Sequence, residues 1–282
     1  MSVDRLPWRA VSAGLVCLLL TNIGAGAPYQ DVVIADNPIG YYRLNETTGT
    51  VASNAVGTIH GTYQGFVDAD LGQPGALDGP LNTAARFNGS ESSGANVNRV
   101  VIDQNLLAGI GAGPFAIELL AQKTVAGRGD LFNLKGSGGD LGLIWDYDEK
   151  PYIFWNVATT TKGASLPLNQ YHHLVVTRDN ASQMTMYVDG LVYGTGSNSA
   201  NLNAIQHAIW IGSNHDNSDN PSLPFNGLVD EIAIYDRVLT ADEVSLHYAA
   251  SLVPEPSTLA SLAAGLAGLL LCRIRRRGTR TP

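Results

Sequence analysis

One stretch, residues 171–192, restricts the possible folds more than any other part of the chain. It reads YHHLVVTRDNASQMTMYVDGLV, with turn dipeptides at Asp179-Asn180 and Asp189-Gly190. Side chains alternate between the faces of a strand, so the adjacent His172 and His173 are expected on opposite faces. A second strand places three apolar side chains on one face, namely Met184, Met186 and Val188. The stretch therefore predicts an antiparallel β-meander that is buried on at least one side.

This meander resembles the laminin-G-like (concanavalin A-like) jelly-roll domain, whose usual pattern is Trp-His-His-Val in one strand and Tyr-Val-Asp-Gly at the end of the next. Tyr171 stands where Trp is usual. The segments NPIGYYRLNETTGT, AARFNG and GLVDEIAIYDRVLTADEV resemble further motifs of the family in their usual order. The resemblance covers roughly residues 29–250. It implies an all-β fold, a two-sheet antiparallel jelly-roll sandwich with one short helix after the last strand.

Strand signals and turns along the chain agree with a single domain over residues 28–250. The composition, with 31 Gly, 13 Pro and 15% charged residues, is typical of a loop-rich β protein. Thr240 and Glu243 have capping-box spacing and predict a helix over Thr240 to Tyr248. The expected strands outside the meander are Ile39 to Leu44, Ala84 to Gly89, Val97 to Ile102, Phe115 to Gln122, Asp130 to Leu134, Leu141 to Asp146, Tyr152 to Asn156, Ala208 to Ile211 and Gly227 to Tyr235.

The first 27 residues have the pattern of a secretory signal peptide. Arg5 and Arg9 precede an apolar run from Val11 to Leu20, and small residues follow before Pro28. A short membrane anchor is the weaker interpretation. We expect residues 1–27 to be absent from the mature protein.

The last segment, residues 251–282, resembles the PEP-CTERM sorting tail. An apolar stretch over about residues 258–272 predicts a short transmembrane helix, with the domain outside the membrane. The resemblance implies export across the inner membrane and processing by an exosortase, at the cell envelope, outer surface or extracellular matrix of a Gram-negative bacterium. A plain tail anchor is the alternative. The motif consists of Pro254, Glu255, Pro256 and the arginines Arg273, Arg275, Arg276 and Arg277.

The charge of the central domain limits its partners. Between Pro28 and Val253 there are ten basic and twenty-three acidic residues, a net charge of −13. Such a domain repels nucleic acid and attracts cations. Both cysteines, Cys17 and Cys272, lie in the terminal segments, so the domain must be stable without disulfides.

No motif in the sequence indicates an active site. Glycosidases of this overall fold place two carboxylates on one strand, commonly as Glu-x-Asp-x-x-Glu, and the chain has no such match. Glu118 stands alone on its expected strand, and the histidines lack metalloprotease spacing. We therefore expect a binding module rather than an enzyme, with an unrecognised glycoside hydrolase as the least favoured alternative.

The aromatic hairpin from Trp145 to Trp155 is the expected ligand surface. Exposed rings stack on sugar faces, so Trp145, Tyr152, Trp155 and the neighbouring Asn156 are the predicted binding residues for a glycan or exopolysaccharide. Two alternatives stay open. The rings fill the sandwich instead, or the protein is a structural matrix component without a specific ligand.

The resemblance also implies one structural calcium ion at the edge of the sandwich. In related jelly rolls the Asp at the position of Asp230 often ligates calcium, together with backbone carbonyls. The matching carbonyl here comes from near Gly89. Calcium prefers six to eight oxygen ligands, so this is expected to be a modest structural site.

Overall fold

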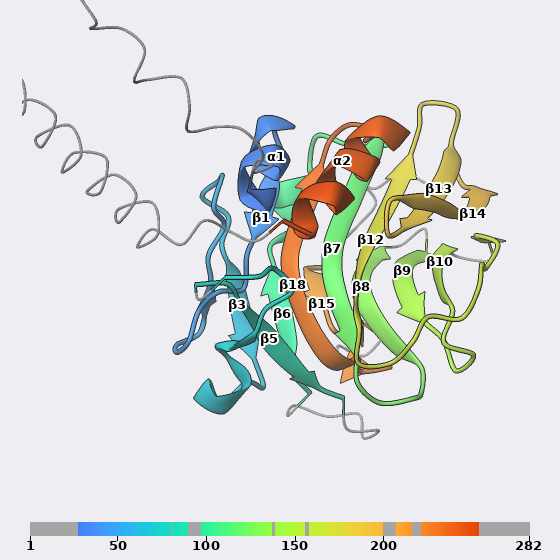
Figure 1. Ribbon diagram of the computed structural model, residues 1–282. Coiled ribbons are helices and arrows are strands. Elements are labelled where there is room, and N and C mark those ends of the chain that lie inside the picture. The colour runs from blue at the N-terminus through green and yellow to red at the C-terminus, as the bar shows by residue number, and fades with distance from the viewer. Residues whose placement is uncertain are drawn as a thin grey trace, which may run out of the picture.

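The computed structural model describes residues 28–79, 81–89, 97–136, 139–155, 158–199, 207–215 and 221–253. In this part of the chain two large antiparallel sheets face each other, and two short helices pack on the outer side of one of them (Figure 1). The helices are α1 (Tyr29–Ala35) and α2 (Ala241–Ser251), and single 3₁₀ turns occur at Asp68–Asp70 and Gln104–Leu107.

The first sheet, sheet A, is the one that the helices cover. Its strands follow the order β14-β13-β12-β7-β18-β5-β4, and β1 pairs with β18 beyond the part that pairs with β5. The strands are β1 (Gly40–Tyr42), β4 (Gln73–Pro74), β5 (Thr83–Asn88), β7 (Phe115–Lys123), β12 (Tyr171–Arg178), β13 (Gln183–Val188), β14 (Leu191–Ser197) and β18 (Asn226–Tyr235).

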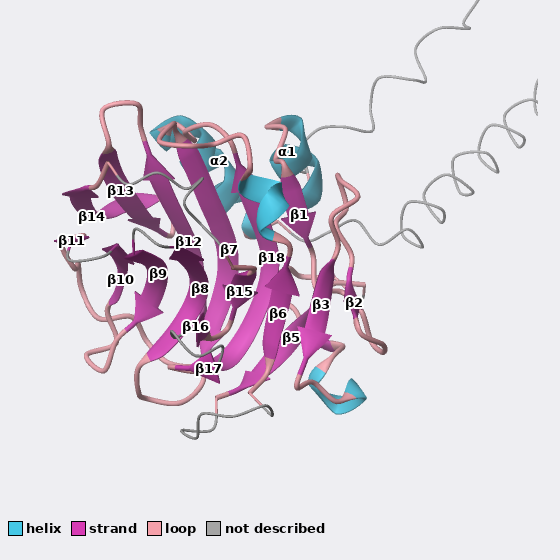
Figure 2. Ribbon diagram, turned by 180° about the vertical axis from the view of Figure 1, so that it is seen from behind, coloured by secondary structure: helices cyan, strands magenta, loops and turns pink. Residues whose placement is uncertain are grey.

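The second sheet, sheet B, lies on the side away from the helices (Figure 2). Its order is β11-β10-β9-β8-β15-β6-β3-β2, and a small two-stranded sheet pairs β16 with β17. The strands are β2 (Val51–Ala52), β3 (Gly61–Gln64), β6 (Arg99–Ile102), β8 (Gly129–Gly136), β9 (Gly139–Trp145), β10 (Pro151–Trp155), β11 (Ala158–Thr159), β15 (Ile209–Ile211), β16 (Asn214–His215) and β17 (Pro221–Ser222).

Strand alternation divides the apolar side chains into two layers. On β7, Ile117 and Leu119 face the core between the sheets, while Ala116 and Leu120 pack under the helices. The meander follows the same rule, because Met184, Met186 and Val188 all belong to the central core. The predicted alternation of the meander is therefore confirmed.

The layer under the helices contains a buried polar network around Glu118. This carboxylate is fully buried and accepts hydrogen bonds from four side chains on four different elements. The other ring nitrogen of His247 lies 2.8 Å from Asp36 Oδ2. The network thus joins α1 and α2 to sheet A. The four groups are Tyr29 on α1 (2.7 Å), His173 on β12 (2.7 Å), Tyr235 on β18 (2.9 Å) and His247 on α2 (2.9 Å).

The two-sheet antiparallel sandwich with a short C-terminal helix is confirmed. Helix α2 begins as the capping box predicts, since Thr240 Oγ1 accepts the Glu243 N–H (3.2 Å) and Glu243 Oε2 accepts the Thr240 N–H (2.7 Å). It continues to Ser251, three residues further than expected. The sequence did not indicate α1 as a helix, nor the four-residue strand β3, nor the short strands β2, β4, β11, β16 and β17, which have only two residues each.

The predicted signal peptide, residues 1–27, and residues 254–282 of the predicted tail, including the apolar stretch at 258–272, lie outside the described residues. Within the described residues, no helix is long and apolar enough to cross a membrane.

Candidate functional site

A pocket of about 340 Å³ lies at one end of the sandwich, where several connections meet. These are the loop between β7 and β8, the turn between β9 and β10, and the segment that leads into β18. The described side chains at the pocket include Lys123, Val125, Arg128, Tyr147, Pro224 and Asn226.

Lys123, at the end of β7, stabilises one wall of this pocket. Its side chain is buried, and Nζ donates to the carbonyl oxygens of Gly127 and Asp146. Nζ also forms an ion pair with Glu149 Oε2 at 2.7 Å. Burial lowers the pKa of Lys123, and the contact with Glu149 opposes that shift. Lys123 therefore holds the β7–β8 loop against the hairpin turn.

Tyr147 is the aromatic residue that this turn presents to solvent. Its side chain is 74% exposed, and its backbone N–H donates to Asp146 Oδ1 at 2.9 Å. Beside it, Arg128 donates from Nη2 to the Tyr152 hydroxyl at 2.9 Å. A solvent-facing ring next to a guanidinium and a pocket is an arrangement suited to sugars, because rings stack on apolar sugar faces and polar groups bind hydroxyls.

The structure corrects the predicted binding residues of the hairpin. Trp145 is fully buried in the central core, so its ring cannot stack on a ligand. Tyr152 faces the outer side of sheet B but is only 7% exposed, because Lys162 Nζ lies 4.4 Å above its ring and Arg128 binds its hydroxyl. The side chain of Trp155 and the whole of Asn156 lie outside the described parts of the chain.

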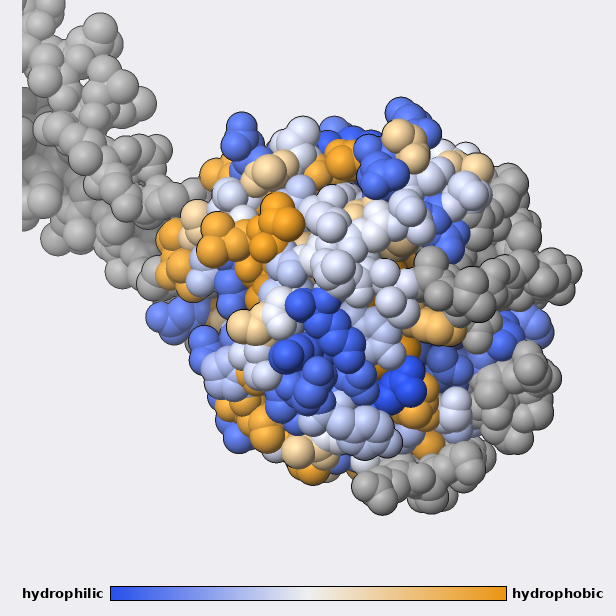
Figure 3. All heavy atoms as spheres, turned by 90° about the vertical axis from the view of Figure 1, so that its right-hand side faces the viewer, coloured by the Kyte–Doolittle hydropathy of each residue, from blue (hydrophilic) through white to orange (hydrophobic). Residues whose placement is uncertain are grey.

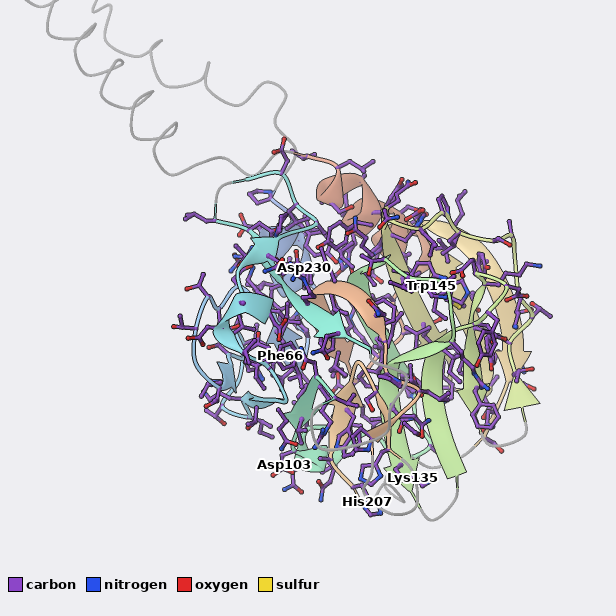
Figure 4. All side chains as sticks on the ribbon, turned by 90° about the horizontal axis from the view of Figure 1, so that it is seen from below. Phe66, Asp103, Lys135, Trp145, His207 and Asp230 are labelled. Atoms are coloured by element: carbon purple, nitrogen blue, oxygen red, sulfur yellow. The ribbon has the colours of Figure 1, made fainter. Side chains whose placement is uncertain are left out.

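The two predicted calcium ligands lie apart. Gly89 lies beside Phe225, whose carbonyl oxygen accepts the Gly89 N–H at 3.0 Å. Asp230 is five residues further along β18, about 16 Å away at ~3.3 Å per strand residue. One ion therefore cannot contact both residues. Asp230 is also well separated from Trp145 (Figure 4).

Asp230 by itself retains one feature of a cation ligand. It is fully buried, Oδ2 accepts the Ala76 N–H at 2.8 Å, and Oδ1 has no hydrogen-bond partner among the described residues. Burial and the neighbouring Glu231 raise the pKa of Asp230. Among the described residues, no group of three His, Cys, Asp or Glu side chains is placed to hold a metal.

A second buried carboxyl lies directly behind the pocket. Asp130 follows the pocket residue Gly129, and its Oδ2 accepts from the amides of Asn214 (2.9 Å) and Asn133 (3.1 Å). Burial raises the pKa of Asp130 to about 8, although both amides oppose the shift. The hydrogen-bond partners of its Oδ2 are amides, which does not match the carboxylate pair of a glycosidase.

The sequence indicated that Tyr147 is exposed, but no pattern in it indicated that Asp130 is buried. Tyr147 stands between Asp146 and Asp148 in a turn, and a ring flanked by charges in a turn is expected to be exposed. The burial of Asp130 depends on a register shift in β8 between Asp130 and Phe132. No local pattern predicts that shift.

Comparison with known families agrees with this architecture. The family model of the concanavalin A-like lectin/glucanases superfamily matches residues 108–245. This match confirms the predicted resemblance to that superfamily over residues 108–245. The PEP-CTERM protein-sorting motif matches residues 252–277, which contain all the predicted sorting residues. This motif implies exosortase processing and export to the envelope or exterior of a Gram-negative bacterium.

Solved structures resemble this chain in fold, at low sequence identity. A Trypanosoma rangeli sialidase mutant with trans-sialidase activity has a TM-score of 0.55 and 18% identity, over 74% of this chain and 32% of the sialidase. This chain thus spans about a third of the sialidases that it matches. A second similar structure is domain 4 of AbnA, a GH43 extracellular arabinanase from Geobacillus stearothermophilus, in complex with arabinotriose. Its TM-score is 0.52 at 18% identity, over 75% of this chain and 98% of the arabinanase domain.

A third similar structure is botulinum neurotoxin type C, from work on the dependence of its cell entry on two ganglioside molecules. Its TM-score is 0.53 at 16% identity, over 77% of this chain and 51% of the toxin chain. A search of curated proteins finds no match to the sequence. At these identities the similarity establishes the fold alone.

Proposed function

We propose that the domain is a secreted, non-enzymatic module that binds glycan and retains extracellular polysaccharide at the cell envelope. The observation behind this proposal is the exposed ring of Tyr147 beside the pocket and Arg128. The sorting motif supports a place of action outside the inner membrane.

Two similar structures support a carbohydrate ligand. The arabinanase domain is bound to arabinotriose, and the neurotoxin interacts with gangliosides. Figure 3 shows the character of one side of the domain surface. In the part of the face drawn in colour in Figure 3, hydrophilic side chains gather at the centre and apolar side chains form small separate groups.

Tyr147→Ala is expected to weaken polysaccharide binding by about tenfold or more, the scale of an aromatic anchor at a binding site. Its melting temperature should stay close to that of the native domain, because an exposed side chain contributes within about 0.5 kcal/mol to the free energy of unfolding. A glycan array identifies the ligand, and titration of that ligand measures the loss.

Leu191→Ala is the matched control. Leu191 is also 74% exposed but begins strand β14 and does not line the pocket. Tyr147→Phe keeps the ring and should bind nearly as the native domain does. If no array glycan binds, or if Tyr147→Ala binds like Leu191→Ala, the glycan proposal is wrong and a structural role is favoured.

We also propose one structural calcium ion held through Asp230 and not through Gly89. The buried Oδ1 of Asp230, for which the described part of the chain offers no hydrogen-bond partner, supports this placement. Backbone carbonyl and amide oxygens must supply the other ligands, and calcium accepts both.

Calcium at about one hundred times its dissociation constant should add ~2.7 kcal/mol to the free energy of unfolding. For a domain of this size the melting temperature should then rise by about 5 to 10 °C. The measurement compares melting in millimolar calcium and in excess chelator, for the native domain and for Asp230→Asn. A native domain that melts identically in both conditions rules the ion out, and a shift that Asp230→Asn preserves places it elsewhere.

A further inference from the structure

The pocket beside Tyr147 adjoins a second one. This neighbour, of about 670 Å³, lies over the ends of β5 and β18, and its lining includes Arg86, Gln73 and Thr124. Gly89 and Asn226 line both pockets, so the two adjoin at these residues and are here together called the double pocket.

The junction of the double pocket is fixed by the two shared residues. Asn226 Nδ2 donates to the Gly89 carbonyl at 3.2 Å, and its Oδ1 accepts from Thr124 Oγ1 at 3.1 Å. A Cβ atom at Gly89 would come within 2.6 Å of the Phe225 carbonyl oxygen, so glycine permits the close approach of these chains. The junction is thus preorganised by side-chain and backbone contacts.

The charge of the double pocket is opposite to that of the domain around it. The described lining residues include three basic side chains, Arg86, Lys123 and Arg128, and no acidic side chain. Between Pro28 and Val253, however, acidic residues outnumber basic ones by twenty-three to ten. A surface with this overall charge repels anions everywhere except at a local cationic site.

Arg86 and Arg128 are held less tightly by acidic partners than Lys123 is. Lys123 is paired with Glu149 at 2.7 Å. Arg128 Nε is 3.9 Å from its ion-pair partner Asp146, and the Arg128 side chain is 31% exposed. Arg86 is exposed, and its guanidinium donates to the neutral amide oxygen of Gln73. A guanidinium binds carboxylates through two parallel hydrogen bonds.

We propose that the double pocket selects an acidic polysaccharide, one that carries carboxylates or similar anionic groups along its chain. This inference rests on the proposed glycan-binding function and specifies its ligand class. Tyr147 supplies the stacking surface at one end, and Arg86 binds an anionic substituent at the other.

The test compares two polymers with the same backbone, polygalacturonate and its fully methyl-esterified form. We expect the native protein to bind the acidic polymer more tightly, and this preference to shrink as salt rises from about 0.02 M to about 0.3 M, because salt screens exposed charges. Arg86→Gln should weaken binding of the acidic polymer by about tenfold, the typical effect of losing a charged hydrogen bond, and leave binding of the ester unchanged.

Lys150→Gln is the matched control. Lys150 lies in the same hairpin turn as Tyr147, is partly exposed and lines neither pocket. It should change binding of neither polymer by more than about twofold. Equal binding of both polymers, unaffected by Arg86→Gln but lost in Tyr147→Ala, overturns the charge selection and leaves glycan binding intact. Absence of binding to either polymer also overturns it, and the glycan array then decides the proposed function separately.

Discussion

Glu118→Gln is expected to lower the free energy of unfolding by ~3–5 kcal/mol, the usual effect of breaking a buried charge network. For a domain of this size that corresponds to a fall of roughly 6 to 20 °C in melting temperature. The carboxylate is fully buried and accepts hydrogen bonds from two tyrosines and two histidines. The neutral amide of Gln cannot replace the negative charge of the carboxylate among these partners. The helices α1 and α2 therefore lose their common attachment to sheet A.

The pH dependence of this effect has a definite sign. Burial by itself raises the pKa of Glu118, but hydrogen bonds from His173 and His247 outweigh it and hold the pKa below its usual range. This carboxylate therefore stabilises the fold above its unfolded pKa of about 4.3, and the contribution is lost as the pH falls.

His247 shifts in the opposite direction. Burial lowers the pKa of its imidazole, but contacts with Glu118 and Asp36 outweigh burial and raise it. Its contribution to the free energy of unfolding is complete below the unfolded pKa of about 6.5. That contribution is lost as the pH rises through the raised pKa of the folded state. The difference in melting temperature between native and Glu118→Gln protein should thus be largest between about pH 4.5 and pH 6.5.

Thermal melting from about pH 3.5 to pH 9 measures this difference. Asp31→Asn is a suitable control, because Asp31 is an exposed carboxylate on α1 and should contribute less than about 1 kcal/mol. A Glu118→Gln protein that melts like the control near pH 5.5, or a difference that does not vary with pH, contradicts the role assigned to the network.

Local patterns predicted most of the longer strands and the start of α2, since both depend on neighbouring residues. Alternation placed His172 and His173 on opposite faces, and the spacing of Thr240 and Glu243 located α2. The Glu118 network was not predictable in the same way. Its partners lie between 55 and 129 residues away in sequence, so only the packing of α1 and α2 on sheet A brings them together.

Backbone irregularities account for the other differences between the predicted and the observed structure. β18 changes register between Asp230 and Ala233, and Glu231 has φ of 53°, a left-handed value that favours glycine. This bulge buries both Asp230 and Glu231 in a strand that otherwise alternates regularly. The sequence at this point, LVDEIAIYD, contains no Gly or Asn to indicate it.

Trp145→Ala is expected to destabilise the domain by ~3–5 kcal/mol, as deletion of a buried ring typically does. The Trp145 side chain is fully buried among apolar residues of both sheets. Its ring centre lies 6.0 Å from that of His172 and 6.4 Å from that of Phe225. Tyr147, two residues later, is exposed. In this hairpin Trp145 thus stabilises the fold, while Tyr147 is the proposed binding residue.

The comparison of these two substitutions tests that separation directly. Trp145→Ala should lower the melting temperature by roughly 6 to 20 °C, while Tyr147→Ala should leave it nearly unchanged and weaken glycan binding. Trp145→Phe should lose less stability than Trp145→Ala, because it retains a ring and because Nε1 of Trp145 has no hydrogen-bond partner to lose within the described residues. A Trp145→Ala protein with native melting and impaired binding would restore Trp145 to the ligand surface, which its complete burial now excludes.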